Sequence, residues 1–397
     1  MSFNGAPPAH AASSPVHVEP GTETELAAAL AYANENGMRV APRGGGTKTC
    51  WGNPSPKTDV ILSTLRLNRI IEYGWADLTV TVEAGCTMTA LQATLAEHGQ
   101  RVAVDPLWPE RATVGGVLST SDSGALRLGF GGLRDLIIGI TMCLPDGTLA
   151  RSGGKVVKNV AGYDLPKLAT GALGTLGVIT RAVFRLHPKP QSTRTLSISL
   201  GTTNAVRQLL ETVQNSKLTP AALQIRLASE APWQAEILLE GTSAGVAFQA
   251  DQFGSLIGDG TIREEPPSIW NAREELWSNT RDQAIAKLSV LPSEIARMSE
   301  TVQSVLGGPM RWQLLWYGMG IGWLRIEGAS AQIQAALRSL RMVVEEQDGS
   351  LVVVRQPRES SVDAWGSVGA AKDLMRAVKS QFDPRGTLNF GRFVAGI

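Results

Sequence analysis

The sequence predicts an α+β fold with two domains, and three observations lead to this prediction. Glycine is concentrated in the first half of the chain, where glycine loops alternate with short β-branched runs. A long strand pattern then enters His187-Pro188-Lys189-Pro190, where the two prolines end it and mark a domain boundary. Beyond this point a unit in the order strand, helix, strand, strand, helix is followed by a similar one, which is typical of ferredoxin-like layers.

Residues 16–190 are predicted to form the first domain, after a flexible tail over residues 1–15 that is rich in Ala, Ser and Pro. Apolar residues at helical spacing, each time followed by a glycine, predict helices over residues 24–37 and 89–97. Short apolar and β-branched runs predict strands at residues 38–41, 60–62, 70–73, 78–83, 137–144, 149–151 and 178–186. The turn Pro145-Asp146-Gly147 should join two of these strands into a hairpin.

Residues 191–370 are predicted to form a second, α/β domain, and residues 371–397 a C-terminal helix with a trailing segment. The first unit of the second domain has predicted strands at 195–200, 222–226 and 235–240 and helices at 203–215 and 243–256. The second unit has predicted helices at 292–306 and 330–346 and strands at 311–317, 322–326 and 351–354. The last predicted helix covers residues 372–382.

Composition excludes several classes of protein. The 37 basic and 36 acidic residues give a formal net charge of +1, without the clustered positive field that nucleic acids or anionic membranes require. Three widely spaced cysteines, Cys50, Cys86 and Cys143, are too few for an iron–sulfur cluster or a structural zinc, so no metal is predicted. Because no apolar run is long enough to span a bilayer, we expect a cytoplasmic protein whose membrane contacts, if any, come through partner subunits.

A first glycine loop, PRGGGTK, follows a predicted strand. Its glycines permit positive φ, so that backbone N–H groups converge on an anion, and Thr47 adds a hydroxyl donor. Arg43 and Lys48 are candidates to neutralise a diphosphate, or else two solvated loop charges, and a triple glycine is also typical of a flexible turn. The candidate binding residues of this loop are Pro42, Arg43, Gly44, Gly45, Gly46, Thr47 and Lys48.

Two further segments combine small residues with hydroxyls, which permits close approach to a large flat ligand. Candidates in the second segment, predicted as a loop, are Asp105, Pro106, Thr113, Val114, Gly115, Gly116, Ser119, Asp122, Ser123 and Gly124. Candidates in the third segment are Lys158, Gly162, Tyr163, Asp164, Leu165, Gly174, Thr175, Gly177, Val178 and Ile179. The chain's last segment adds Asn389 and Arg392.

In this order and at these intervals, PRGGGTK, ATVGGVLSTSDSG with GLRD, and GYDLPKL with GTLGVIT resemble the FAD-binding domain of the p-cresol methylhydroxylase/vanillyl-alcohol oxidase type. FDPRGTLNFGR resembles the family's segment that returns from the cap domain to the flavin. The resemblance implies a two-subdomain FAD-binding domain, a ferredoxin-like α/β cap domain and non-covalent FAD. In that family the first loop binds the pyrophosphate, the second lines the pyrophosphate and flavin ring, and GTLGVIT lies against the cofactor.

Within this family, residues 155–180 and the LNFGR end most resemble the FAD-binding E subunits of glycolate oxidase. This implies electron transfer during the oxidation of glycolate to glyoxylate, in a complex with a D-type flavin subunit and an iron–sulfur F-type subunit. Two alternatives remain open: a self-sufficient FAD-dependent oxidase or dehydrogenase of another 2-hydroxy acid or alcohol, and a flavin-free assembly subunit.

The predicted cap departs from its relatives in having no histidine. The four histidines, His10, His17, His98 and His187, all precede residue 190, whereas D-type relatives carry a cap motif HxGDGNLH. A group that accepts the hydroxyl proton of the substrate is therefore not evident. In addition, Leu173 replaces the glutamate of the family's GSEGTLG.

The candidate catalytic residues are Tyr163 and Arg273. Arg273 stands in a WxxR pattern, where an arginine can bind a carboxylate bidentately, or else form an ordinary helix salt bridge. Lys158 and Tyr163 are placed to reach the flavin ring or a carboxylate, or else to serve as a surface lysine and a structural tyrosine. Two predicted cap strands carry dense aromatic residues: Trp312, Trp316, Tyr317 and Trp323. These residues could line a flavin-facing pocket, or they could form a buried sheet face or a subunit interface.

Overall fold

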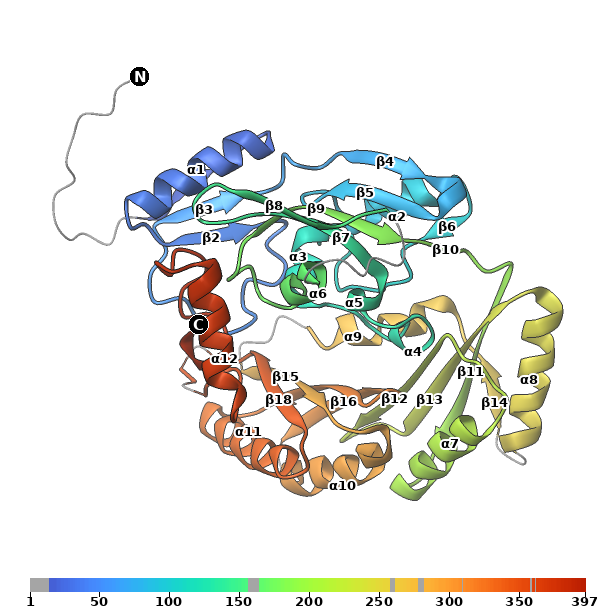
Figure 1. Ribbon diagram of the computed structural model, residues 1–397. Coiled ribbons are helices and arrows are strands. Elements are labelled where there is room, and N and C mark those ends of the chain that lie inside the picture. Colours follow the sequence, from blue (N-terminus) through green and yellow to red (C-terminus); the bar gives the residue numbers. More distant parts are fainter. Residues whose placement is uncertain are drawn as a thin grey trace.

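The computed structural model describes residues 14–155, 164–257, 261–277, 282–308, 310–357, 359–360 and 362–397. The predicted Lys158, Gly162 and Tyr163 lie outside these residues. The amino-terminal sheets lie on one side of the molecule and an eight-stranded sheet on the other, with the short helices α4 (Arg127–Phe130) and α9 (Ala272–Glu275) between them (Figure 1).

A three-stranded parallel sheet carries the first glycine loop. Its strand order is β1 (Val16–Val18), β3 (Val60–Ser63) and β2 (Val40–Arg43), and the loop starts where β2 ends. Helix α1 (Glu23–Glu35) is capped by the Thr22 hydroxyl, which accepts from the Glu25 amide at 3.1 Å. Its apolar residues at helical spacing, Leu26, Leu30 and Ala33, pack into the core that this sheet shares.

The second sheet is five-stranded and holds the other two glycine segments against its core. Its strand order is β4 (Ile70–Gly74), β5 (Thr79–Glu83), β9 (Val178–Arg185), β7 (Ile137–Cys143) and β8 (Leu149–Gly153). The predicted hairpin is present, because β7 and β8 pair antiparallel. The helices of this part are α2 (Met88–Ala96), α3 (Val114–Thr120), α4, α5 (Leu133–Leu136) and α6 (Leu165–Ala169).

Helix α3 corrects the prediction that the second glycine segment is a loop. The Thr113 hydroxyl caps it by accepting from the Gly116 amide at 3.4 Å, and Val114, Val117 and Leu118 are buried. The glycines hid this helix because they weaken its propensity, which the packing of its apolar face offsets.

The cap is one antiparallel sheet of eight strands. In each half the order along the chain is strand, helix, strand, strand, helix, strand. The first half contains β11 (Ser192–Leu200), α7 (Thr203–Asn215), β12 (Ala222–Ala228), β13 (Trp233–Gly241), α8 (Ser243–Ile257) and β14 (Ile262–Glu264). The second half contains β15 (Gln283–Ser289), α10 (Ile295–Leu306), β16 (Arg311–Tyr317), β17 (Ile321–Glu327), α11 (Ser330–Glu345) and β18 (Ser350–Arg355).

The two faces of the cap sheet have different partners. Helices α7, α8, α10 and α11 cover one face (Figure 1) and share the largest core with it. The other face meets loops of the amino-terminal part through a smaller apolar cluster, which includes Trp51 and Leu107 from those loops and Tyr317 and Trp323 from the cap. Two strands that pair antiparallel, β6 (Gln100–Arg101) and β10 (His187–Pro188), lie where the chain crosses into the cap.

The C-terminal segment returns to the first sheet after helix α12 (Ala371–Phe382). The Lys379 ammonium donates to the Asp383 carboxylate at 2.6 Å and to the carbonyls of Thr175 and Leu388 at 2.8 and 3.1 Å. The Val40 amide then donates to Thr387, and the Asn389 amide to Val40. The buried Lys379–Asp383 pair therefore holds the returning segment beside β2.

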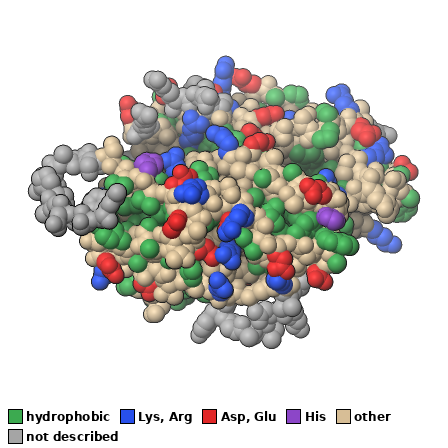
Figure 2. Space-filling model, turned by 90° about the horizontal axis from the view of Figure 1, so that it is seen from above, with side chains coloured by type: hydrophobic (Ala, Val, Ile, Leu, Met, Phe, Trp, Pro, Cys, Tyr) green, Lys and Arg blue, Asp and Glu red, His purple; other side chains and the backbone are tan. Residues whose placement is uncertain are grey.

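Lys and Arg side chains are interspersed with Asp and Glu on the face seen from above in Figure 2, so this face carries no large field of one sign. Among the residues that the structure describes, no helix combines the length and apolar character needed to cross a membrane.

Candidate functional site

One cleft brings together the three glycine segments and the returning C-terminal segment. Its empty volume is about 690 Å³, including its open mouth. The predicted residues that line it are Pro42, Arg43, Gly44, Gly45, Gly46, Thr47, Lys48, Thr113, Gly115, Gly116, Ser119, Gly174, Gly177, Val178, Ile179, Asn389 and Arg392. Three residues that the sequence reasoning did not single out also line it, Thr49, Thr64 and Thr120, and so does Leu173, which stands where the family has a glutamate.

The first glycine loop offers a row of donors to this cleft. Among the described residues, the amides from Gly44 through Lys48 donate to no backbone carbonyl. The loop also packs too closely for side chains, because a Cβ on Gly44 would lie 2.1 Å from the Thr113 hydroxyl oxygen and one on Gly45 1.8 Å from the Arg111 carbonyl oxygen. Free amides converging in a glycine loop are a typical anion site.

Asn389 gives the cleft a buried acceptor. Its backbone is held at φ +45° and its side-chain amide donates to the Leu173 carbonyl at 2.6 Å. Its Oδ1 atom is buried and has no hydrogen-bond partner among the described residues, which suits a ligand that brings an N–H or O–H group. Leu173 contributes its backbone here, since its amide also donates to the Ser119 carbonyl.

Arg392 clamps the first glycine loop from the C-terminal segment. Its guanidinium donates to the carbonyls of Trp51, Lys48 and Thr49 at 3.1, 3.0 and 3.0 Å. These carbonyls belong to the loop's far end, so Arg392 ties the returning C-terminal segment to that end of the loop. The role of Arg392 in this structure is therefore to shape the loop.

Lys48 and Arg273 share one carboxylate. The Lys48 ammonium lies 3.1 Å from Asp122 Oδ2, and the Arg273 guanidinium lies 2.8 Å from Asp122 Oδ1. All three side chains are buried, so Lys48 is not a solvated loop charge. Arg273 is not in an ordinary helix salt bridge, because its partner Asp122 is in the other domain. Arg43 is exposed at the cleft and has no ion pair among the described residues.

Several predicted binding residues lie outside the cleft lining. The half-buried Asp105 accepts through its carboxylate from the amides of Gly124 and Leu126 at 2.8 and 3.3 Å, and burial raises the pKa of Asp105. Asp164 caps helix α6 by accepting from the Lys167 amide at 3.1 Å. Also outside the cleft lining are Pro106, Val114, Ser123, Leu165 and Thr175.

The cap aromatics divide between the two faces of the sheet. Trp312 and Trp316 pack with the helices, and the Trp316 indole donates to the Ser299 hydroxyl at 3.0 Å, so the buried-sheet-face alternative holds for them. Trp323 and Tyr317 face loops of the amino-terminal part, and the ring centroids of Trp323 and Trp51 lie 5.7 Å apart. The interface they form joins two domains of one chain.

Lys287 is a half-buried lysine in this interface that the sequence reasoning missed. Its ammonium lies 5.7 Å from the centre of the Trp323 ring, and burial lowers its pKa to about 8. Strand β15, which carries it, lacks the alternation that would have marked a strand in the sequence, because Gln283–Ser289 is buried almost throughout.

Replacing Lys287 with methionine is expected to stabilise the protein at pH 7. The folded-state pKa of about 8 lies below the unfolded value of 10.5, so the charged lysine destabilises the fold fully below pH 8. The gain in the free energy of unfolding should be about 2–3 kcal/mol. It should vanish as pH rises from 8 to about 10.5, because Lys287 then loses its proton in the unfolded chain as well. Urea unfolding at pH 7 and pH 10 measures this difference. An exposed-site control, Lys189→Met, should show no such gain, and a Lys287→Met gain that is independent of pH would contradict the prediction.

Comparison with known proteins agrees with the geometry of the cleft. Residues 15–153 match the family model described as an FAD binding domain. The chain is 32% identical over 207 residues to the glycolate oxidase subunit GlcD of Bacillus subtilis, an alignment that covers 52% of this chain and 44% of that protein. It therefore spans less than half the length of that relative.

Two other relatives align over nearly the whole chain. The mitochondrial D-2-hydroxyglutarate dehydrogenase of Bos taurus is 27% identical over 95% of this chain and 76% of its own length. The D-lactate dehydrogenase of Archaeoglobus fulgidus is 27% identical over 99% of this chain and 95% of its own length. A solved alkyldihydroxyacetonephosphate synthase superposes with a TM-score of 0.72 at 19% identity, over 94% of this chain and 76% of that one, which shows the shared fold.

Proposed function

We propose that this chain is the E-type subunit of a glycolate-oxidising complex, on the basis of its match to an FAD binding domain and its similarity to a glycolate oxidase subunit and to a D-lactate dehydrogenase. It would hold FAD without a covalent bond and work beside a D-type flavin subunit and an iron–sulfur F-type subunit. It would be cytoplasmic, with any membrane contact made by its partners.

One observation carries this proposal: the Arg273 guanidinium is already bound to groups within the protein. The one cap arginine that the sequence offered for a substrate carboxylate uses its guanidinium on Asp122 and on the carbonyls of Ser123 and Asp105, at 2.8, 3.0 and 2.6 Å. The sequence also has no histidine after residue 187 to accept a hydroxyl proton. Both features suit a subunit that carries flavin while a partner oxidises the substrate.

The cleft provides the groups that such a subunit needs. When bound, FAD supplies the redox chemistry, accepting and passing on electrons. The amides of residues 44–48 would hold its diphosphate, and Asn389 Oδ1 would accept from one of its donors. These unsatisfied groups argue against a flavin-free assembly subunit.

A second candidate function, a self-sufficient 2-hydroxy-acid dehydrogenase, is favoured by the composition of the domain interface. The indole Nε1 atoms of Trp51, Trp277 and Trp323 are buried without a hydrogen-bond partner among the described residues. Lys287 adds a cation to the same cluster. A carboxylate only accepts hydrogen bonds, so these donors suit a 2-hydroxy acid.

One experiment separates the two functions. The chain is purified alone and with the products of its neighbouring genes, flavin is counted per subunit, and anaerobic flavin bleaching by glycolate, D-lactate and D-2-hydroxyglutarate is followed. The E-subunit proposal expects one FAD in this chain, no bleaching of that FAD when the chain is alone, and bleaching of that FAD by glycolate in the complex. Rapid bleaching of the isolated chain by any of the acids would refute it in favour of the self-sufficient enzyme.

A further inference from the structure

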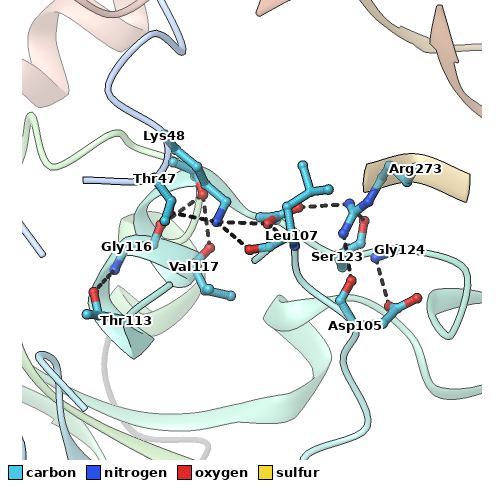
Figure 3. A network of polar contacts seen from close by, with 12 residues as sticks. Thr47, Lys48, Asp105, Leu107, Thr113, Gly116, Val117, Ser123, Gly124 and Arg273 are labelled. Atoms are coloured by element: carbon cyan, nitrogen blue, oxygen red, sulfur yellow. Dashed lines mark hydrogen bonds and ion pairs between the residues drawn. The ribbon is translucent and has the colours of Figure 1, made fainter. Parts of the chain in front are cut away.

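A chain of buried charges links the cap to the first glycine loop. Arg273 in α9 of the cap binds Asp122, which follows α3, and Asp122 binds Lys48 in the glycine loop. Figure 3 shows Arg273 reaching toward the turn that contains Ser123 and Gly124, while the Lys48 ammonium points at the Leu107 carbonyl, 3.3 Å away. One carboxylate thus bridges a cation of each domain.

The carboxylate is fixed on both oxygens. Oδ1 accepts from Arg273, and Oδ2 accepts from the Leu107 amide at 2.9 Å besides facing Lys48. Burial acts to raise the pKa of Asp122, but Arg273 and then Lys48 outweigh it and hold this pKa below its ordinary value. Asp122 is therefore ionised, and neither cation has another carboxylate within ion-pair distance among the described residues.

The position of Lys48 depends on this pair. Its side chain is buried, so the ammonium needs a counterion, and burial already lowers its pKa despite Asp122. If Arg273 leaves, Asp122 loses one of its two cations, and the hydrogen bonds from Arg273 to Asp122 and to the carbonyls of Ser123 and Asp105 disappear. Asp122 can then shift, and Lys48 shifts with it. Since Lys48 is part of the cleft lining, its displacement moves the amides of residues 44–48.

We propose that Arg273 is a positioning residue for the cofactor: docking of the cap fixes the first glycine loop through Asp122 and Lys48, so that FAD affinity depends on a cap residue outside the cleft. By linkage, bound FAD strengthens cap docking by the same factor. This inference does not depend on which acid is oxidised or by which subunit.

The interface offers a matched control. Arg101 of β6 and Glu240 of β13 form a second ion pair between the two domains, with Arg101 Nη1 3.1 Å from Glu240 Oε1. Neither residue lines the FAD cleft or contacts the glycine loop. Glu240→Gln therefore weakens the docking of the cap without touching the path through Asp122.

The test measures the dissociation constant of FAD by quenching of flavin fluorescence on titration of the apoprotein. We expect Arg273→Met to weaken FAD binding about tenfold, Arg273→Lys to restore part of the affinity, and Glu240→Gln to change it less than twofold. A double-mutant cycle compares Lys48→Met, Arg273→Met and the double variant. The double variant should lose FAD affinity by a factor much smaller than the product of the two single-variant factors.

Three results would overturn the proposal: wild-type FAD affinity in Arg273→Met, equal losses in Arg273→Met and Glu240→Gln, or multiplicative effects in the cycle. If Arg273 binds substrate instead, Arg273→Met raises KM for the acid and leaves the FAD dissociation constant unchanged. If Arg273→Met does not fold, the cycle is built from Arg273→Lys and Lys48→Met instead. Losses of FAD affinity that simply multiply in that double variant would refute the coupling of Arg273 to Lys48 through Asp122.

Discussion

Gly45→Ala should lower the affinity for FAD about 100-fold or more, as measured by flavin retained on gel filtration and by titration of the apoprotein. The new Cβ would lie 1.8 Å from the Arg111 carbonyl oxygen, a backbone atom that cannot rotate away. The loop must then separate from the second glycine segment, and its amides leave their places. Loss of two charge-assisted hydrogen bonds to a diphosphate is worth about 3 kcal/mol, which corresponds to that factor.

Gly201→Ala provides the control for this variant. A Cβ at Gly201, in the loop after β11, meets nothing within 4 Å. Its FAD affinity should equal that of the wild type. If Gly45→Ala retains FAD as well as Gly201→Ala does, the first glycine loop is not the diphosphate site.

Lys379→Met should cost about 3–5 kcal/mol of the free energy of unfolding, because it leaves a buried carboxylate without its cation. Asp383 is 2% exposed, and among the described residues its carboxylate keeps only the amides of Thr387 and Leu388 as donors. The carbonyls of Thr175 and Leu388 lose a donor as well. The returning segment should loosen from β2, and FAD affinity should fall with it.

Urea unfolding of the apoprotein measures this loss. Lys372→Met, an exposed lysine on the same helix α12, is the matched control and should unfold within about 0.5 kcal/mol of the wild type. A difference of less than about 1 kcal/mol between the two variants would show that the buried pair does not stabilise the returning segment.

The sequence was most informative where a residue's role depends on backbone geometry. The glycine segments were recognisable because glycine is needed wherever backbones approach closely, and Gly44 and Gly45 indeed have no room for a Cβ. The amphipathic helices α1, α7 and α11 and the strands around them were predicted within a few residues of their ends. The return of Asn389 to the cleft was expected from a resemblance, since no local pattern indicates a contact across the whole chain.

What the sequence could not provide is the pairing of buried charges. Lys48, Asp122 and Arg273 each suggested a ligand contact when considered alone, and only tertiary packing shows that they meet one another. Thr64 was missed for a similar reason. Its place in the cleft follows from the parallel pairing of β2 with β3, which puts the ends of the two strands side by side.

The grip of Arg392 on Lys48 has a consequence for biosynthesis, because 344 residues separate the two. At about 5–20 residues per second, translation takes roughly 20–70 s to reach the arginine after the loop has been made. Throughout that interval the nascent loop is unclamped and the pocket lacks its last wall. Cofactor capture must therefore be a late step, completed after the cap has been synthesised.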